Sequence, residues 1–472
     1  MSGSMNVKQF IDEVGKKKID PLIHIKTALQ EVKKANKEFH FMNIIADEQA
    51  IKQAEVIKKN PKGKLAGLPV SIKDCIVVKG LESKAGSAIL EGYKPVYDAT
   101  VVQRLKDEGA IIIGKTAQDA FGFGTFSVNV GNNMEIPLNP IDKERSCGGS
   151  SGGSGAITKW ASFPHISIGE STGGSIAAPA AFCGVFGLCP TYGRVSRYGL
   201  MDYASSLDKI GPMASSSYDL ALSLSVIAGH DPNDATSLKE PADDYLAAIK
   251  KEVNGLKVGI IKESFGEGID PQVSKEVKKA IEVLKKKGLG AKEISLPLVA
   301  KYGVSCYYLI AMSEASTNLA KYCGMRYGRH EKLEGNFNEY FTKVRSKHFN
   351  QETKRRIIIG TFARMAGYRD AYYIKAAKVR TKIISEYKAA FKEVDVLISP
   401  TMPIISPKFD DIKKLTPLQN YMMDIMTVGP NLAGLPHCSI PIGNVEGMPV
   451  GMMAIGDHLE EKKVLQVASV FG

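Results

Sequence analysis

Strand-like and helix-like segments alternate along most of this chain, and this alternation restricts the fold more than any other feature. Residues 65–80 (LAGLPVSIKDCIVVKG) predict a strand, a turn and a second strand, residues 99–109 a helix, and residues 110–114 (AIIIG) a further strand. Four later apolar runs also predict strands: GLKVGIIKE, EVDVLISP, HCSIPIG and PVGMMAIGD. We therefore expect an α/β fold in which helices pack on a sheet.

The chain divides into a helical beginning and a long remainder. Residues 1–63 contain three segments with apolar positions at helical spacing, and we expect this N-terminal helical segment to pack on the core. Residues 64–472 read as one domain, in which residues 176–188 (IAAPAAFCGVFGL) predict a helix. The polar, proline-bearing stretch 229–245 is either an internal boundary or a surface loop.

Composition indicates the cellular compartment and the kinds of partner that we expect for the protein. Seven cysteines, an odd number without a C-x-x-C pair, and the lack of an apolar leader favour a reducing, cytoplasmic compartment. No apolar run reaches the ~18 residues of a membrane helix. The net charge of +12 is compatible with nucleic-acid contact, but lysines scattered along helices such as residues 273–288 are typical of solvated helix faces.

A phosphate-binding motif matches the sequence and is nevertheless rejected. Residues 109–116 (GAIIIGKT) satisfy the P-loop pattern, in which a flexible loop follows a strand and its backbone N–H groups surround a phosphate. Here the variable positions are Ala-Ile-Ile-Ile, which form strands and do not readily curl around a phosphate. We expect neither a nucleotide at Lys115 nor a metal site in this chain.

Two patches rich in glycine and serine, residues 147–154 (CGGSSGGS) and 169–175 (GESTGGS), indicate chemistry when they are read together with Lys73 in PVSIKD. A serine hydroxyl becomes nucleophilic only when a base takes its proton. His165, in the apolar FPHISI, is more typical of a packed histidine than of that base. A lysine serves if its pKa of about 10.4 falls by ~3 units, which burial favours.

The second patch suits a nucleophile, and the first suits a proton relay. The backbone N–H groups of Thr172, Gly173, Gly174 and Ser175, ahead of a predicted helix, are placed to stabilise an oxyanion beside the Ser175 hydroxyl. We expect the first patch to bend sharply, so that a second hydroxyl, that of Ser150, lies between the lysine and the nucleophile. The alternative, two surface loops and an exposed lysine, remains open on spacing alone.

Longer motifs around these residues strongly resemble the amidase signature family. The similar stretches are GLPVSIKD, GGSSGGS and GGSIAAPAAFCGVFGLCPTYGRVSRYGL, and the resemblance extends from about residue 64 to the end. It implies a large mixed central β-sheet covered by helices on both faces, and a Ser–cisSer–Lys triad. In that triad Lys73 is the base, Ser150 the relay serine after a cis peptide bond, and Ser175 the nucleophile, with Ser151 as the neighbour that could be mistaken for the relay.

Within this family, four stretches are similar to the glutaminase subunits of tRNA-dependent amidotransferases: residues 191–213, 313–328, 354–376 and 421–443. The resemblance implies that the chain hydrolyses glutamine to glutamate and ammonia, and that a partner uses the ammonia to amidate Glu-tRNA(Gln), Asp-tRNA(Asn) or both. It places ATP and magnesium on a tRNA-binding partner, the B subunit of such complexes. It also implies a small third partner, the C subunit, and leaves this chain without a cofactor.

The same resemblance assigns the groups that hold glutamine. Arg356 would bind the α-carboxylate, with Arg355 as its rival, and Asp424 would bind the α-amino group. A guanidinium fork suits a carboxylate, and a carboxylate suits an ammonium. Tyr307, or its neighbour Tyr308, would line the same pocket.

The chain departs from the family pattern next to these residues. The usual Thr-Asp before Thr-Gly-Gly-Ser is Glu170-Ser171, and residues 117–124 (AQDAFGFG) keep Asp119 but lose a glutamate. The stretch between the two serine patches also looks one residue longer than usual. These departures leave the triad intact and put the contacts behind it in doubt.

Two other functions remain as alternatives. One is a stand-alone hydrolase of the same family that acts on another amide. The other, suggested by the positive charge, is a non-catalytic tRNA-binding or scaffold subunit. Ammonia release from glutamine and labelling of Ser175 by an electrophilic glutamine analogue distinguish these possibilities.

Overall fold

A computed structural model of the chain describes residues 5–472, and its organising feature is one mixed sheet of eleven strands. The strands are β1 (Met42–Ile45), β2 (Pro69–Lys73), β3 (Ile111–Thr116), β4 (Ile166–Ser171), β5 (Phe186–Cys189), β6 (Lys209–Ala214), β7 (Lys257–Ile261), β8 (Gly290–Ile294), β9 (Val396–Pro400), β10 (His437–Val445) and β11 (Met448–Gly456). Their order across the sheet is β1-β3-β2-β4-β6-β5-β10-β11-β9-β7-β8.

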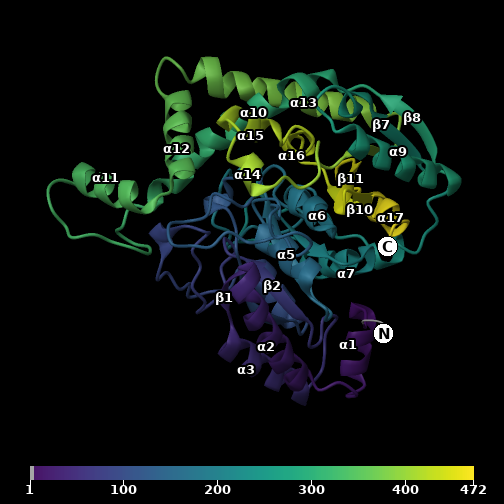
Figure 1. The fold of residues 1–472 in the computed structure, drawn as a ribbon, viewed down its shortest axis with the longest axis horizontal. Coiled ribbons are helices and arrows are strands. Elements are labelled where there is room, and N and C mark those ends of the chain that lie inside the picture. The colour runs from purple at the N-terminus through teal and green to yellow at the C-terminus, as the bar shows by residue number, and fades with distance from the viewer. Residues whose placement is uncertain (1–4) are drawn as a thin grey trace.

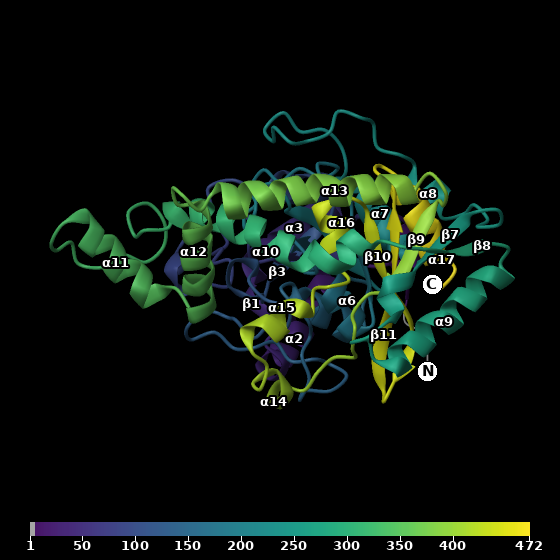
Figure 2. The same ribbon diagram turned by 90° about the horizontal axis from the view of Figure 1, so that it is seen from above.

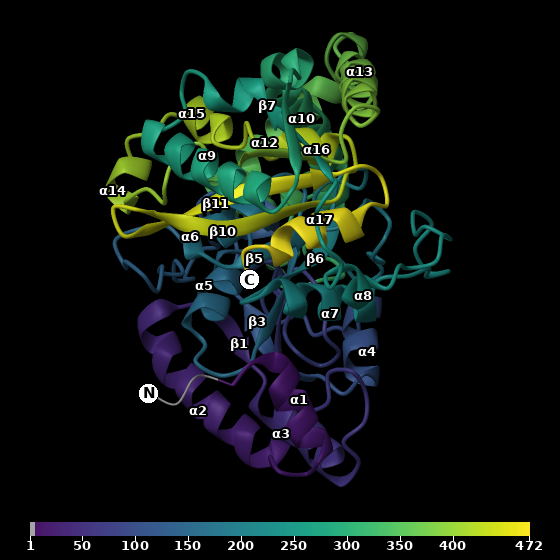
Figure 3. The same ribbon diagram turned by 90° about the vertical axis from the view of Figure 1, so that its right-hand side faces the viewer.

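Helices cover this sheet. They are α1 (Val7–Gly15), α2 (Pro21–Phe39), α3 (Asp47–Lys59), α4 (Thr100–Asp107), α5 (Gly152–Trp160), α6 (Ala177–Cys183), α7 (Ser217–Ile227), α8 (Tyr245–Ala248), α9 (Pro271–Lys286), α10 (Pro297–Asn318), α11 (Phe337–His348), α12 (Gln351–Arg364), α13 (Lys375–Ala390), α14 (Phe409–Ile412), α15 (Pro417–Met422), α16 (Val428–Leu432) and α17 (Glu461–Ser469). Figure 3 shows α9 above β10 and β11 and α6 below them. The expected mixed sheet with helices on both faces is therefore present.

The sheet joins two halves of the chain. In the first half β2 lies between β3 and β4 and is parallel to both, and in the second half β7 lies between β8 and β9 and is parallel to both. The halves meet where β5 pairs antiparallel with β10, through His437↔Cys189 and its neighbours. Figure 1 shows α1–α3 at the β1–β3 end and α10, α12 and α13 at the opposite end. In Figures 1 and 2, α11 extends away from the rest of the molecule, whereas α12 packs against α10.

The three N-terminal helices form as predicted, but the strand between α2 and α3 was missed. The Asp20 side chain caps α2 by accepting hydrogen bonds from the backbone N–H groups of Leu22 and Ile23. β1 then pairs antiparallel with β3, so this segment also supplies an edge strand. β1 has only four residues, and so short a run has little periodicity to detect.

Two predicted elements are wrong. The second strand expected within residues 75–80 does not form, because the Ile76 N–H bonds back to the Lys73 carbonyl in a turn and the Val77 N–H bonds to Gly199. The helix expected over residues 176–188 ends at Cys183, where Gly184 has a φ of 67°, and the chain continues as β5. Residues 229–244 connect α7 to α8 without a helix or a strand of the sheet.

The first glycine-serine patch is a loop up to Ser151, and its last residues begin a helix. α5 starts at Gly152, and a Cβ atom on Gly153 would lie 2.4 Å from the Phe41 carbonyl oxygen and 2.5 Å from the Ala117 nitrogen. The glycines thus let backbones approach closely. Within residues 5–472, no helix has the length and apolar character that crossing a membrane requires.

Candidate active site

Lys73 is the last residue of β2, and its side chain is completely buried. Its Nζ donates hydrogen bonds to Ser150 Oγ at 2.7 Å, to Glu170 Oε2 at 2.8 Å and to the Glu170 carbonyl oxygen at 3.0 Å. The next residue, Asp74, pairs instead with Lys115 at 3.7 Å, as strand alternation predicts. The sheet thus brings Lys73 and Ser150, which lie 77 positions apart in the chain, into contact.

Ser150 follows a cis peptide bond, Gly149–Ser150. The loop that carries it is built around Asp119, whose carboxylate accepts hydrogen bonds from the backbone N–H groups of Ser127 and Asn129 at 3.0 and 2.8 Å. A Cβ atom on Gly149 would lie 2.2 Å from Asp119 Oδ2, so the loop has no room for a larger residue there. Burial raises the pKa of Asp119 to about 6.

The neighbouring Ser151 points elsewhere. Its hydroxyl donates to the Glu170 carbonyl oxygen at 3.0 Å, and its backbone N–H donates to the Ser175 carbonyl oxygen at 3.2 Å. Of the two adjacent serines, Ser150 is the one in contact with the lysine amine. This hydrogen bond from the Ser151 backbone links the two glycine-serine patches.

Ser175 lies in the turn between the end of β4 and the start of α6, and only 6% of it is exposed. The backbone N–H groups of residues 172–175 donate no hydrogen bond to another described residue. Close packing explains the two glycines here. A Cβ atom on Gly173 would lie 2.9 Å from the Tyr307 hydroxyl oxygen, and one on Gly174 would lie 2.6 Å from Thr427 Oγ1.

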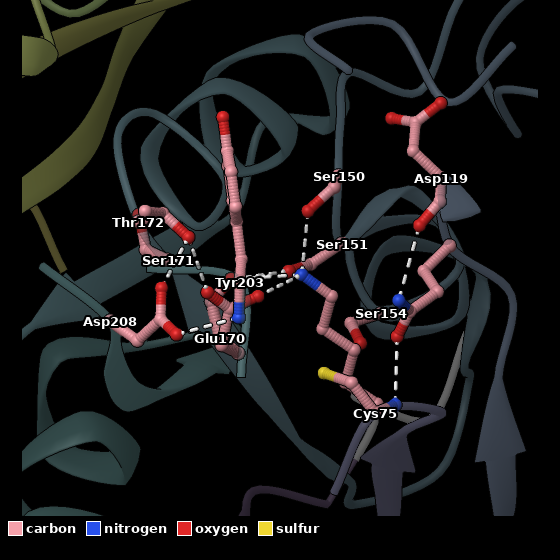
Figure 4. A network of polar contacts seen from close by, with 12 residues as sticks. Cys75, Asp119, Ser150, Ser151, Ser154, Glu170, Ser171, Thr172, Tyr203 and Asp208 are labelled. Atoms are coloured by element: carbon pink, nitrogen blue, oxygen red, sulfur yellow. Dashed lines mark hydrogen bonds and ion pairs between the residues drawn. The ribbon is translucent and has the colours of Figure 1, made fainter. Parts of the chain in front are cut away.

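A network behind Lys73 was not predicted from the sequence. The Glu170 carboxylate contacts Lys73 through Oε2 and the Thr172 hydroxyl through Oε1, at 2.9 Å. The same hydroxyl lies 2.7 Å from Asp208 Oδ1. Figure 4 shows Ser150 on one side of this network and Thr172 and Asp208 on the other, with Glu170 between them. The signal that could have found it was Glu170, one of the departures from the pattern that the sequence resembles.

Arg356 is buried on α12, whereas its rival Arg355 is about one-third exposed. The Arg356 guanidinium donates from Nε to Glu352 at 2.8 Å and from Nη1 to the Tyr203 hydroxyl at 2.7 Å. The rings that surround it belong to Phe123, Tyr203, Tyr308 and Tyr421. Its Nη2 donates no hydrogen bond within residues 5–472.

Asp424 is brought near Arg356 through Tyr308. The Tyr308 hydroxyl donates to Asp424 Oδ2 at 2.5 Å, and its ring packs on the Arg356 guanidinium. Thr125 donates to the other Asp424 oxygen at 3.0 Å. Burial raises the pKa of Asp424 above its ordinary value, against these hydrogen bonds. Tyr307 is buried against Gly173, so it reaches the second glycine-serine patch instead.

A cavity of about 770 Å³ opens beside Arg356, and Thr125, Arg355 and Tyr421 also line it. Buried polar groups at the wall of a cavity are the usual arrangement of a small-molecule site. The site therefore offers a buried amine in contact with a hydroxyl, a row of free backbone donors, and a guanidinium at a cavity whose wall includes Thr125, the residue that donates to the Asp424 carboxylate.

The two rejected candidates lie outside this arrangement. His165 is buried, its Nε2 lies 3.1 Å from Ser71 Oγ, and desolvation lowers its pKa to about 3. Lys115 lies within β3 and donates to Ser83 at 2.8 Å and to the Asp74 carbonyl oxygen at 3.1 Å. The strand thus lies inside the phosphate-binding motif, which confirms the reason for rejecting it.

Comparison with known proteins identifies the family to which the chain is similar. The model of the family described as Amidase matches residues 24–465. The A subunit of glutamyl-tRNA(Gln) amidotransferase from Cyanothece sp. is 46% identical over 94% of this chain and 92% of its own length. The protein of the same name in Sulfurihydrogenibium sp. is 44% identical over 99% and 96%. The crystal structure of the Thermotoga maritima counterpart, which carries that name too, has a TM-score of 0.80 at 35% identity, covering 97% of this chain and 93% of that one.

Proposed function

Because this chain belongs to the amidase family, we propose that it is the glutaminase subunit of a tRNA-dependent amidotransferase. In this proposal it hydrolyses glutamine through Lys73, Ser150 and Ser175, and a partner protein uses the ammonia. The observation that carries the proposal is the buried contact of 2.7 Å between Lys73 Nζ and Ser150 Oγ. An amine with no exposure and a hydroxyl within hydrogen-bond distance form the base and relay that an otherwise weak serine nucleophile needs.

The proposed chemistry begins with Lys73 in its neutral form. Ser150 gives its proton to the amine and takes the Ser175 proton as Ser175 Oγ attacks the side-chain amide carbon of glutamine. The oxyanion that forms is stabilised by the free N–H groups of residues 172–175. The relay then returns a proton to the departing ammonia, and water releases glutamate from the acyl-enzyme.

Recognition of glutamine is assigned to the second half of the chain. Arg356 Nη2, with no acceptor in residues 5–472, would bind the α-carboxylate, and Asp424 would bind the α-ammonium. Thr125 and Tyr308 hold the Asp424 carboxylate, and Tyr307 supports the turn that carries the backbone donors. The burial of Arg356 favours it over Arg355 for this role.

The partner assignments follow from the relatives, whose names describe amidation of Glu-tRNA(Gln). We assign recognition of tRNA, ATP and magnesium to the partner that corresponds to a B subunit, and we expect a small C subunit in the complex. Glu-tRNA(Gln), Asp-tRNA(Asn) or both are the possible acceptors, and the cytoplasm is the expected site of action.

Co-purification with these partners, followed by glutamine-dependent amidation of Glu-tRNA(Gln), tests this function. The expected result is amidation that requires glutamine, ATP and an intact Ser175. Ammonia release from simple amides but not from glutamine would indicate a stand-alone amidase. Amidation supported by ammonia but never by glutamine, together with no labelling of Ser175 by 6-diazo-5-oxonorleucine, would indicate a scaffold.

A further inference from the structure

The Thr172 hydroxyl lies between two carboxylate oxygens, and this position constrains where protons lie. It is 2.9 Å from Glu170 Oε1 and 2.7 Å from Asp208 Oδ1, and all three side chains are buried. A hydroxyl has one hydrogen to donate, and an ionised carboxylate only accepts. If both carboxyls were ionised, one of the two short contacts would join two acceptors without a hydrogen. One of the carboxyls must therefore carry the proton.

The surroundings show which carboxyl that is. Glu170 Oε2 contacts the Lys73 amine at 2.8 Å, whereas Asp208 has no comparable cationic contact in the described part of the chain. Its Oδ2 accepts backbone hydrogen bonds from Tyr203 and Ala204, at 2.8 and 3.0 Å, which a neutral carboxyl also accepts. Burial, and after it the charge of Glu170, raises the pKa of Asp208 well above its ordinary value, against the attraction of Arg197. The chain of donors therefore runs from Asp208 to Thr172 to Glu170.

We propose that Glu170 is a positioning residue that acts on the base: its carboxylate pairs with the Lys73 ammonium in the resting site and so sets the pH above which the triad becomes active. The inference rests on the proposed function, because it takes Lys73 as the base of the Ser150–Ser175 relay. With Glu170 ionised, all three hydrogens of an Nζ ammonium have acceptors, at Ser150 Oγ, at Glu170 Oε2 and at the Glu170 carbonyl oxygen. To accept a proton from Ser150, the amine must first lose one of these hydrogens.

The other ionisable groups around Lys73 are few. Asp119, behind the cis loop, attracts the same charge, but burial raises its pKa to about 6. Cys75 lies on the turn after β2, and burial raises the pKa of its thiol so that it stays neutral. Lys115 and Asp74 face one another on the opposite side of β2. Glu170 is thus the carboxylate in direct contact with the base.

Removing the charge of Glu170 should therefore lower the pH at which Ser175 becomes reactive. An opposite charge in contact with an ionisable group shifts its titration by about 1–3 pH units in favour of the charged form. Glu170→Gln keeps the size and the hydrogen-bond acceptor but loses the charge. The acidic limb of the pH profile of Ser175 modification, in which Ser175 Oγ displaces fluoride from a sulfonyl fluoride, is expected to move down by about 1–3 pH units.

The probe is phenylmethylsulfonyl fluoride, and the readout is the rate of Ser175 modification between about pH 5 and pH 10, measured by intact mass and peptide mapping. This reagent modifies the nucleophile without glutamine recognition. Asp208→Asn is the matched control. An asparagine reproduces the neutral acid, because its side chain can donate to Thr172 and accept from the backbone N–H groups of Tyr203 and Ala204. The acidic limb of the pH profile of Ser175 modification is therefore expected to stay within about 0.3 pH units of its position in the unchanged protein.

An unchanged limb in Glu170→Gln, or a larger shift in Asp208→Asn than in Glu170→Gln, would overturn the proposal. If Glu170→Gln does not fold, Glu170→Thr carries the same expectation. A failure of the proposed function looks different. In that case Ser175 is not labelled in the unchanged protein, or it is labelled while glutamine is not hydrolysed.

Discussion

At the scale of single residues, the buried Lys73–Ser150 contact makes the clearest prediction. Ser175→Ala and Lys73→Ala should each reduce glutamine hydrolysis to the background of the assay, because in the proposed mechanism the first lacks the nucleophile and the second the base. Ammonia release by the complex measures this, and circular dichroism confirms that each variant is folded. Turnover near that of the unchanged complex in either folded variant would refute the triad.

The two adjacent arginines of α12 allow a matched comparison. Arg356→Lys keeps the charge beside Glu352 but loses the planar fork, so kcat/KM for glutamine should fall by ~10-fold or more. Arg355→Lys, at a partly exposed position, should change it by less than about fivefold. Butyramide, which has no α-carboxylate, provides the control. An equal loss of kcat/KM for butyramide would show that Arg356 does not bind the α-carboxylate of the substrate.

Residue-scale sequence reasoning found the groups that motifs carry and missed the groups that only the fold brings together. Lys73 and Ser150 belong to recognisable sequence motifs, and the structure places the two side chains in contact. Glu170 was noticed only as a departure, because its contact with Lys73 spans 97 positions and its link to Asp208 passes through Thr172. The choice between Arg355 and Arg356 depended on burial, which helical spacing alone did not decide.

At the scale of elements, the first glycine-serine patch can pack closely against neighbouring backbone and side chains because its glycines have no side chain. Gly149→Ala would place a Cβ 2.2 Å from Asp119 Oδ2 and 2.6 Å from the Ser127 nitrogen. Such overpacking should lower the free energy of unfolding by about 1–3 kcal/mol and displace Ser150. Gly290→Ala, where no described atom lies within 4 Å, should change it by less than about 0.5 kcal/mol. Urea unfolding measures both, and equal losses would contradict this explanation.

Elements with a strong apolar period were predicted well, and short or mixed ones were not. The runs at β7, β9, β10 and β11 are strands as expected. The missed β1 has only four residues, and the stretch after β2 forms a turn because its backbone donors find partners in loops. The boundary between α6 and β5 depends on Gly184 in the left-handed conformation, which the uninterrupted apolar run concealed.

At the scale of the whole molecule, buried histidines predict a loss of stability in acid. Burial lowers the pKa of His165 to about 3 and that of His24 to about 4. Each stays neutral in the fold but gains a proton in the unfolded chain below about pH 6.5. The stabilisation is therefore complete above that pH. It falls as the pH drops from about 6.5 toward the folded pKa, by up to ~1.4 kcal/mol per pH unit for each histidine.

Urea unfolding between about pH 7 and pH 5 measures this loss. His165→Gln should flatten the dependence on pH, because it removes one of the buried histidines whose pKa is lowered by burial, the others being His24 and His437. His230→Gln, at an exposed position, should leave the slope as it is. Equal slopes in the two variants would show that His165 does not contribute.

The junction of β5 with β10 has a consequence for how such proteins diversify. Lys73, Ser150 and Ser175 come from the β2–α6 side of that junction, while Arg356 and Asp424 come from the stretch between β8 and β10. In the proposed function, the groups that cleave the amide bond and the two charged groups that hold the substrate thus come from different parts of the chain, and Tyr203 and Thr125 of the first part link the two by contacting Arg356 and Asp424. A chimera that receives the later stretch from a distant homologue is therefore expected to keep its original hydrolytic groups, and to acquire that homologue's substrate preference only if the residues at positions 125 and 203 suit the new stretch.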